Sequence, residues 1–418
     1  MGDIGLNSPM VLFISWCPDT DPQEDEESDS NFTPAGTPTS QPVNAAQLDP
    51  RPETVDDSGD DFVSLPVIDV LDDEGMCLGI LLPLHKIRLR IIHVRRPFIV
   101  EDMLKVFRNN VTGMVKVDIA GENAVDSGGV FRDVLSEFWE KCFQKHFEGE
   151  DECVLVPSPQ LSPDDFSTIG KILLVGYEQQ GFFPIRFSRV LLICAMFSRD
   201  LVSNDLLLES FFRTLSNFER DSLENALLLV NLEGDILDDI IDILSRFRVT
   251  TIPKCRESLR LCLVRVAEIQ LIENHAFSLQ QMLPHMEKLK LFSDFQTVSA
   301  ILALYIRLKP TGRKVTNILK AAPKNVTEQR VLDFLKRFIR SMSDDLLTAF
   351  LRYCTGSNVL HVDAIEVSFV HLSGLGRRFV AHTCGALLEV PVSYSSFNEF
   401  AGEFRTQLLG GQWDMQIL

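Results

Sequence analysis

The feature that most constrains this chain is the contrast between its first 61 residues and the rest. Residues 1–61 carry 14 acidic side chains and one basic residue, Arg51, so their charge is −13 and only −6 of the −19 total remains for the other 357 residues. From about Pro18 this segment is rich in Pro, Ser, Thr and acid. Such a sequence buries too little apolar surface to offset the entropy lost on ordering. We therefore predict a disordered acidic tail over residues 1–61, followed by a globular body.

The composition argues against several classes of protein. An acidic chain lacks the clustered Lys and Arg needed to bind phosphates, so we expect no nucleic-acid partner. No apolar run approaches the 18 residues of a membrane span and no export signal is recognisable, so we expect no membrane association and a cytoplasmic or nuclear location. The nine cysteines are dispersed without a CxxC pair, which favours reduced thiols over a disulfide framework or a zinc site.

A short apolar and acidic stretch lies between the tail and the body. Val67, Ile68 and Val70 stand together and are followed by the acidic residues 72–74. This pattern resembles a SUMO-interacting motif, in which an apolar strand adds to the edge of the partner's sheet and the acids face basic residues. The alternative is that the stretch is the first strand of the body, because such short matches often arise by chance. Both interpretations stand for this connecting segment, residues 62–85.

Hydrophobic periodicity assigns the first elements of the body. Val115, Val117 and Ile119 alternate with polar residues, as in a strand with one buried face. The apolar residues that follow recur at helical spacing and predict an amphipathic helix with a buried cysteine: Phe131, Val134, Leu135, Phe138, Trp139, Cys142 and Phe143. Gly128 and Gly129 precede this helix without the lysine of a phosphate-binding loop, so we interpret them as a tight turn into it.

Residues 161–306 have helical periodicity almost throughout. Breaks between helices are expected at Gly181, Pro184, Pro253, Pro284 and Pro310. The next segment, 307–326, contains six basic residues and few large apolar ones, so it is a candidate linker. We therefore expect the body to consist of a large helical part and a separate C-terminal part.

The last 90 or so residues predict a small α/β unit. A helical stripe runs from Val331 to Ile339, and strand alternation follows at Ile365, Val367 and Phe369. The unit closes with a helix that begins at a capping box formed by Ser396 and Glu399, has a buried stripe at Phe400, Phe404 and Leu408, and stops at Gly410. The fold class of the body is therefore predicted to be α+β.

Cys384, in the stretch AHTCGALLEVPVSY, raises the question of function. A free cysteine is most commonly a buried, inert thiol. It can also be a nucleophile, and His382 shares its face if the segment is extended. No histidine follows His382, which excludes a papain-like protease. The residues alone leave the buried and the nucleophilic interpretations open.

Several stretches taken together resemble the HECT-type ubiquitin ligases. Thr355-Gly356-Ser357 follows an apolar helix, and Thr383-Cys384 precedes a Leu-x-x-Pro stretch, as in the catalytic lobe of that family. Earlier in the chain, Gly121, Glu122, Asp126, Gly128, Gly129 and Arg132 match the Gly-Glu-x-x-x-Asp-x-Gly-Gly pattern of its larger lobe, and FSTIGKILLVGYEQQGFFP fits the Ile-Gly-Lys helix that follows. The resemblance covers about residues 86–418.

The resemblance implies a bilobal fold and a ubiquitin transferase. Its larger lobe, residues 86–322, would bind a ubiquitin-conjugating enzyme, residues 323–326 would be a hinge, and residues 327–418 would be the catalytic lobe. Cys384 would accept ubiquitin as a thioester and pass it to a lysine of a substrate protein, with His382 and Thr383 supporting the site. No metal or organic cofactor is implied.

The chain departs from the family pattern at a few positions. Gly385 and Ala386 stand where Phe-Asn usually follows the catalytic cysteine. Met415 occupies the position fourth from the end, where an aromatic residue usually anchors the tail, and Trp413 is a candidate replacement. These departures keep a second hypothesis open, namely a catalytically inactive HECT-like scaffold that binds ubiquitin or the conjugating enzyme.

Overall fold

Two hydrophobic cores organise the chain in the computed structural model. One core runs from Ile92 to Leu308 and also includes Val359, and the other runs from Val315 to Leu408. We call residues 87–308 the larger lobe and residues 312–410 the smaller lobe, both of which belong to one compact unit. The structure describes residues 61–63, 87–109, 111, 113–122, 128–156, 160–372 and 374–410, with 61–63, 87, 88 and 375 described by their backbone only.

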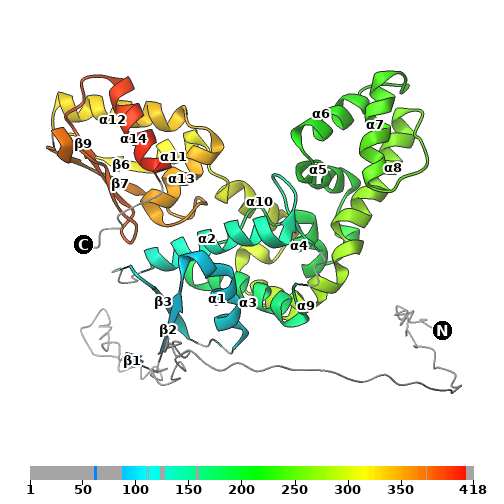
Figure 1. The fold of residues 1–418 in the computed structure, drawn as a ribbon, viewed down its shortest axis with the longest axis horizontal. Coiled ribbons are helices and arrows are strands. Elements are labelled where there is room, and N and C mark those ends of the chain that lie inside the picture. The colour runs from blue at the N-terminus through cyan, green and yellow to red at the C-terminus, as the bar shows by residue number, and fades with distance from the viewer. Residues whose placement is uncertain are drawn as a thin grey trace, which may run out of the picture. The chain divides into compact units, whose positions relative to one another are not determined.

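The larger lobe begins with a small sheet covered by helices (Figure 1). Strand β1 (Asp61–Val63) pairs antiparallel with β2 (Ile87–Val94), which pairs parallel with β3 (Met114–Ile119) in a register that places Ile92 beside Val117. Helix α1 (Ile99–Arg108), which follows the short 3₁₀ turn η1 (Arg96–Phe98), connects β2 to β3. The predicted alternation is confirmed, because Val115, Val117 and Ile119 are all buried.

Helices α2 and α3 form the centre of the larger core. Helix α2 (Gly129–His146) buries the whole predicted apolar stripe, including Cys142, and leads through the short hairpin β4 (Phe147–Glu148) and β5 (Val154–Leu155) to α3 (Pro163–Gln180). Gly170 of α3 allows close packing on α9 (Ala276–Leu289), because a Cβ there would lie 3.0 Å from the carbonyl oxygen of Met282. The glycine of the Ile-Gly-Lys stretch is thus explained by helix packing.

The rest of the larger lobe is helical, as predicted. The remaining elements are α4 (Arg189–Met196), η2 (Arg199–Leu201), α5 (Asn204–Thr214), α6 (Asn217–Ala226), α7 (Asp235–Arg246), α8 (Arg256–Leu271), η3 (Glu273–His275), η4 (Ser293–Phe295) and α10 (Val298–Leu308). The break predicted at Pro284 is wrong, because this proline lies inside α9. Burial of Met282 and Met286 on either side of it supplies packing that offsets the lost backbone hydrogen bond.

The smaller lobe is an α/β unit around a mixed sheet. Its elements are α11 (Gly312–Ile318), β6 (Leu319–Ala321), α12 (Val326–Arg340), α13 (Asp344–Thr355), β7 (Ile365–Val370), η5 (Gly374–Gly376), β8 (Val380–His382), β9 (Leu387–Pro391) and α14 (Phe397–Leu409). The sheet has the order β6-β7-β9-β8, and only β8 runs antiparallel to its neighbour. Phe379 and Phe404 stack with ring centroids 3.8 Å apart at the centre of the core.

The last helix begins and ends close to its predicted limits. Ser396 accepts a hydrogen bond from the backbone N–H of Glu399, while the Glu399 carboxylate accepts from the backbone N–H and hydroxyl of Ser395. The cap is therefore shared by two serines instead of closing on Ser396 alone. Phe400, Phe404 and Leu408 are buried as predicted, and the helix ends at Leu409.

The chain passes between the lobes at Lys309–Thr311. Leu308 belongs to the larger core, whereas Val315 and Leu319 belong to the smaller one, and β6 pairs with β7 of the smaller sheet. The predicted hinge, residues 323–326, lies between β6 and α12, so it stands inside the smaller lobe. The basic segment looked like a linker because only a few of its side chains are apolar, yet Val315, Ile318 and Leu319 suffice to fix it on the smaller core.

Some predictions fall on residues outside those that the structure describes. They concern the acidic tail up to Asp60, the SUMO-like residues Val67, Ile68 and Val70, Asp126 of the glycine-rich pattern, and the C-terminal residues Trp413 and Met415. Across the described residues, no helix is long and apolar enough to cross a membrane.

Candidate active site

Cys384 lies in the turn between β8 and β9. These strands pair antiparallel with His382 opposite Leu387, and the turn is closed by a hydrogen bond from the backbone N–H of Gly385 to the carbonyl of His382, 3.2 Å long. The side chain of Cys384 is exposed, whereas His382 and Thr383 before it are buried. A paired sheet therefore holds a short turn whose tip presents one thiol to solvent.

Exposure separates Cys384 from the other cysteines of the described residues. Cys142, Cys153 and Cys354 are buried, and Cys194, Cys255 and Cys262 are partly buried. Burial raises the pKa of the thiols of Cys142 and Cys153, to about 12 and about 11 respectively, which keeps them protonated and unreactive. The sequence left open whether the Cys384 thiol is buried or accessible. The structure shows that it is accessible.

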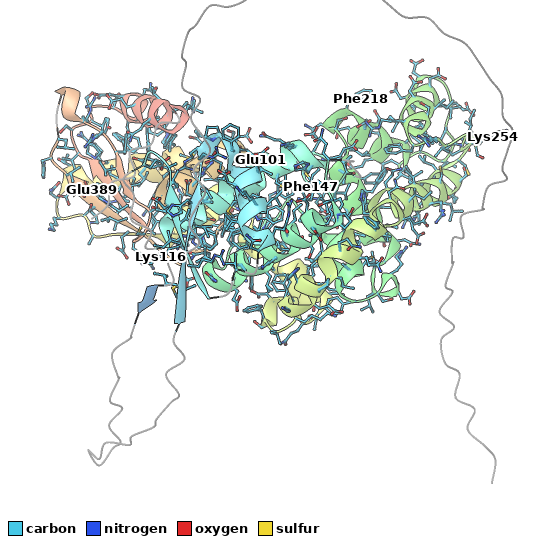
Figure 2. All side chains as sticks on the ribbon, turned by 60° about the horizontal axis from the view of Figure 1, so that its bottom comes forward. Glu101, Lys116, Phe147, Phe218, Lys254 and Glu389 are labelled. Carbon is cyan, nitrogen blue, oxygen red and sulfur yellow. The ribbon has the colours of Figure 1, made fainter. Side chains whose placement is uncertain are left out.

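His382 is held by the neighbouring strand. Its ring Nε2 lies 3.4 Å from Oε1 of Glu389, which stands on β9 opposite Val380 (Figure 2 labels Glu389 on the orange sheet). This distance is long for a hydrogen bond, so the interaction between His382 and Glu389 is weak and serves mainly to orient the imidazole. The structure thus places His382 in the wall beside the turn, and its supporting role stays a prediction.

The start of helix α2, from the larger lobe, packs directly against this turn. A Cβ added at Gly129 would lie 2.5 Å from Oγ1 of Thr383 and 2.9 Å from the backbone nitrogen of Cys384. A Cβ added at Gly356 would lie 2.4 Å from the carbonyl oxygen of Gly129. No side chain fits at either contact, so both positions require glycine.

The two glycines at the start of α2 therefore have different roles. Gly128 has φ of +107°, a conformation that favours glycine, which confirms the predicted tight turn. Gly129 is already helical and needs no special conformation, so its lack of a side chain serves the contact with the Cys384 turn. The sequence analysis did not predict this contact. The available signal was Gly129 itself, because the first position of a helix accepts almost any residue and a glycine there suggests a close neighbour.

Arg132, one turn further along α2, binds two carbonyl groups of the smaller lobe. Its Nε donates to the carbonyl of Thr355 at 3.0 Å, and its Nη2 donates to the carbonyl of Thr383 at 2.9 Å. The arginine that closes the glycine-rich pattern thus fixes the peptide next to Cys384. The motif identified Arg132 as a residue of interest, but it did not predict that the side chain binds the smaller lobe.

The electrostatic surroundings of the turn favour negative charge. The 18-residue helix α2 begins beside the turn with the partial positive charge of a helix N-terminus, and the Arg132 guanidinium adds a full positive charge. An oxyanion formed at a carbonyl attached to the sulfur would therefore be stabilised here. The arrangement is chemically suited to acyl transfer through Cys384.

The site gives no indication of a metal. Across the described residues, no three His, Cys, Asp or Glu side chains come together in a way that could hold a metal ion. A scan against protein-family models and a search of curated proteins returned no match to this chain. The interpretation of the site therefore depends on its geometry and on the motifs.

Ala386 closes the turn in a conformation that is unusual for its residue type. Its φ is +47°, in the left-handed region, while its carbonyl accepts a 2.9 Å hydrogen bond from the backbone N–H of Glu366 on β7. A residue with a Cβ loses about 1–2 kcal/mol in this region. The sheet contact therefore holds a strained residue two positions after the thiol.

We predict that thiol reagents will distinguish the described cysteines. Iodoacetamide applied to the native protein should modify Cys384 first, with Cys255 next, because a hydrogen bond from Ser258 lowers the pKa of the partly exposed Cys255. Cys142 and Cys354 should react only after unfolding. Peptide mass spectrometry over a time course measures this, and labelling of Cys142 as fast as Cys384 would contradict the described burial.

We predict that Ala386→Gly leaves the free energy of unfolding at or slightly above that of the wild type. Relief of about 1–2 kcal/mol of left-handed strain offsets the greater chain entropy of glycine, about 0.5–1 kcal/mol. The same change at Ala401, inside α14, should lower the free energy of unfolding by about 0.5–1 kcal/mol. Urea unfolding of both variants tests this, and equal losses would show that Ala386 is not strained.

Proposed function

We propose that this chain is a HECT-type ubiquitin-protein ligase whose nucleophile is Cys384. The observation that carries the proposal is a convergence of motifs. The glycine-rich pattern at Gly129, the Thr355-Gly356 stretch and the Thr383-Cys384 pair suggested the family separately, although more than 200 residues divide the first from the others. All three meet at one exposed thiol, which would be a coincidence if the motifs had no common task.

The reaction that we propose has two acyl transfers. In the first, the sulfur of Cys384 attacks the thioester carbonyl that joins ubiquitin to a conjugating enzyme. The C–S bond to that enzyme breaks and its thiol leaves, so one thioester replaces another of similar energy and the protein needs to supply mainly positioning. In the second, a substrate lysine attacks the new thioester, an amide forms, and Cys384 is released.

The roles of the neighbouring residues follow from their surroundings. Thr383 holds the turn through its carbonyl, which accepts from Arg132, and His382 with Glu389 shapes the wall beside the sulfur. The start of α2 lies next to the peptide between Thr383 and Cys384, so the positive end of the helix dipole can stabilise the charge that develops on the thioester oxygen. Neither transfer requires a metal or an organic cofactor in this proposal.

The larger lobe offers a surface suited to the conjugating enzyme. Four large apolar side chains are exposed on two loops of the α5–α8 region: Leu228, Leu229, Val230 and Ile252. The loops are joined by hydrogen bonds from the backbone N–H of Arg256 to the carbonyl of Val230 and from that of Leu232 to the carbonyl of Lys254, each 3.2 Å long. Figure 2 labels Lys254, on the loop before α8, and Phe218, another exposed apolar residue, on α6; both lie in the green part of the chain. We propose this apolar surface as the docking site, because exposed apolar clusters mark protein interfaces.

A discharge assay tests the proposed nucleophile. The purified chain is mixed with conjugating enzymes that carry thioester-linked ubiquitin, and the products are separated with and without reductant. We expect a reductant-sensitive adduct that disappears in Cys384→Ala, while Cys262→Ala, which changes a partly buried thiol of α8, retains it. A well-folded wild-type protein that forms no adduct with a broad panel of conjugating enzymes would favour the inactive scaffold instead.

The proposed docking surface is tested by a matched pair of leucines. Leu228 is 77% exposed and lies on the surface, whereas Leu291 is 81% exposed and lies outside it, after α9. We expect Leu228→Asp to slow adduct formation by about tenfold or more, as loss of a central interface contact does, and Leu291→Asp to leave it unchanged. Equal rates for the two variants in a single-turnover assay would place the docking site elsewhere.

A further inference from the structure

One segment of the chain has a charge opposite to that of the whole. Residues 307–340 contain ten basic and two acidic side chains, a net charge of +8, in a protein that has 59 acidic and 40 basic residues. The segment includes α11, β6 and α12 (Figure 1). Most of this positive charge therefore belongs to the smaller lobe, which also carries Cys384.

The basic side chains lie on three neighbouring elements. The basic residues of α12 recur at helical spacing and therefore share one face of the helix. The start of α11 touches the end of α12, because a Cβ added at Gly312 would lie 3.0 Å from the Cα of Arg340. Strand β6, at the edge of its sheet, and the loop after it contribute two exposed lysines. We call these residues the basic surface: Arg313, Lys320, Lys324, Arg330, Lys336, Arg337 and Arg340.

No residue of the basic surface forms an ion pair with a carboxylate of the described residues. Two of its arginines are held by neutral groups instead. Nη2 of Arg330 donates to the carbonyl of Tyr394 at 3.0 Å, and the Arg337 guanidinium lies 4.0 Å from the ring centroid of Phe397. These contacts position the side chains but supply no opposite charge.

The acids of α12 and of the start of α13 leave the basic surface unneutralised. Glu328 is buried and accepts from the backbone N–H of Lys324, so its carboxylate caps α12. Asp333 is exposed but accepts from the side chain of Gln329 at 3.0 Å. The acids that begin α13, residues 344 and 345, form no ion pair with the described basic residues either.

This lack of internal counter-charge is informative because the chain has acid in excess. Elsewhere in the smaller lobe an arginine does find carboxylates, since Arg377 pairs with both Glu399 and Glu403. Like charges that remain close together repel each other and destabilise the folded state. A surface that keeps such repulsion is typical of a site whose opposite charge comes from a partner.

The sheet connects the basic surface to the neighbourhood of the thiol. Lys320 pairs with Glu366 on β7, and Glu366 pairs with Leu387 on β9. Neighbouring strands lie about 4.8 Å apart, so the Cα of Lys320 lies about 10 Å from that of Leu387. Leu387 stands three residues after Cys384. A chain segment bound at the basic surface is therefore within a few residues' reach of the thiol.

We propose that the basic surface binds an acidic segment of the substrate protein, so that lysines close to clusters of Asp and Glu are the preferred acceptors. The inference rests on the proposed function, which supplies the thioester on Cys384. The lysine nitrogen forms a bond to the carbonyl carbon, the electron pair of the C–S bond returns to sulfur, and the amine proton passes to solvent. Binding of the segment raises the concentration of its lysine around the thioester, and thereby the rate of transfer.

A short acidic segment fits the surface better than a large polyanion does. The chain has a net charge of −19, so a nucleic acid or an anionic membrane would meet repulsion from the surrounding molecule. A short peptide responds mainly to charges within about 8 Å, the screening length at physiological salt. The two phenylalanines of the segment, Phe334 and Phe338, pack on the core of the smaller lobe and offer no platform on which bases could stack.

A binding experiment on the full chain tests the surface directly. The probe is a fluorescein-labelled peptide of alternating Glu and Gly with one central Lys, and its partner peptide has Gln in place of every Glu. By fluorescence anisotropy at about 0.05 M salt, we expect the acidic peptide to bind at least about tenfold more tightly than the Gln peptide.

Matched variants show whether the basic surface carries this preference. The double variant Arg313→Glu with Arg340→Glu should lose about tenfold in affinity for the acidic peptide, and the milder Arg313→Gln with Arg340→Gln should lose part of it. Lys288→Glu, which reverses an exposed charge on α9 of the larger lobe, should bind as the wild type does.

A discharge experiment tests the consequence for transfer. The chain is loaded with ubiquitin, the supply is stopped, and either peptide is added as the acceptor. We expect discharge to the acidic peptide to be about tenfold faster than to the Gln peptide, and this ratio to fall toward one at about 0.5 M salt and in the Arg313→Glu, Arg340→Glu variant. If that variant slows loading as much as it slows discharge to the acidic peptide, the surface serves the conjugating enzyme and the inference is wrong.

The remaining outcomes separate the inference from the proposed function. Equal affinity for the two peptides, or tighter binding of a single-stranded oligonucleotide or of phosphatidylserine vesicles than of the acidic peptide, would overturn the inference. A wild-type protein that never forms the Cys384 adduct would overturn the proposed function, while the anisotropy measurement would still show whether the surface binds acidic peptides.

Discussion

Helix α2 is the element on which the rest of the structure depends, because it has two different tasks on two faces. One face places Phe131, Phe138 and Trp139 in the larger core, where all are essentially inaccessible. The other face carries Arg132, Asp133 and Glu137 toward the smaller lobe. An apolar face fixes the helix firmly in one lobe, and a polar face lets it bind the other lobe in a defined geometry without merging the two cores.

The exposed thiol depends on rigid supports on both of its sides. On one side, β8 and β9 pair in register and the stacked rings of Phe379 and Phe404 anchor the segment that leads into β8. On the other side, Gly129 lies so close that a Cβ there would come within 2.9 Å of the backbone nitrogen of Cys384. The thiol therefore stands on a short turn that is positioned by elements whose stability does not depend on the thiol. Functional residues on loops are commonly held in this way by a stable scaffold.

The sequence predicted those parts of the molecule that periodicity governs. The strand at Val115–Ile119, the helix through Phe138 and the closing helix with Phe400 and Phe404 are confirmed, because burial of one face imposes a regular spacing. The passage between the lobes was predicted too late in the chain, since three apolar residues in a basic segment are too few to reveal a helix and a strand.

The candidate site was predictable only in part. Motifs pointed to Cys384, His382 and Thr383, and the structure places these residues together on one turn. The contacts that Arg132 and the ion pair of Asp133 with Arg352 make between the lobes were not predictable, because charged residues on a helix normally indicate a solvated face. Only a contact between segments more than 200 residues apart turns those charges inward, and nothing in the local sequence reports such a contact.

The three-residue connection at Lys309–Thr311 has a consequence for how strong the contact between the lobes must be. It is short, and Lys309 is extended as expected for a residue before proline, so the smaller lobe cannot move far from the larger one. Tethering of this kind gives each lobe an effective concentration in the millimolar range around the other. A contact too weak to hold two separate proteins together is then populated for a large fraction of the time within one chain.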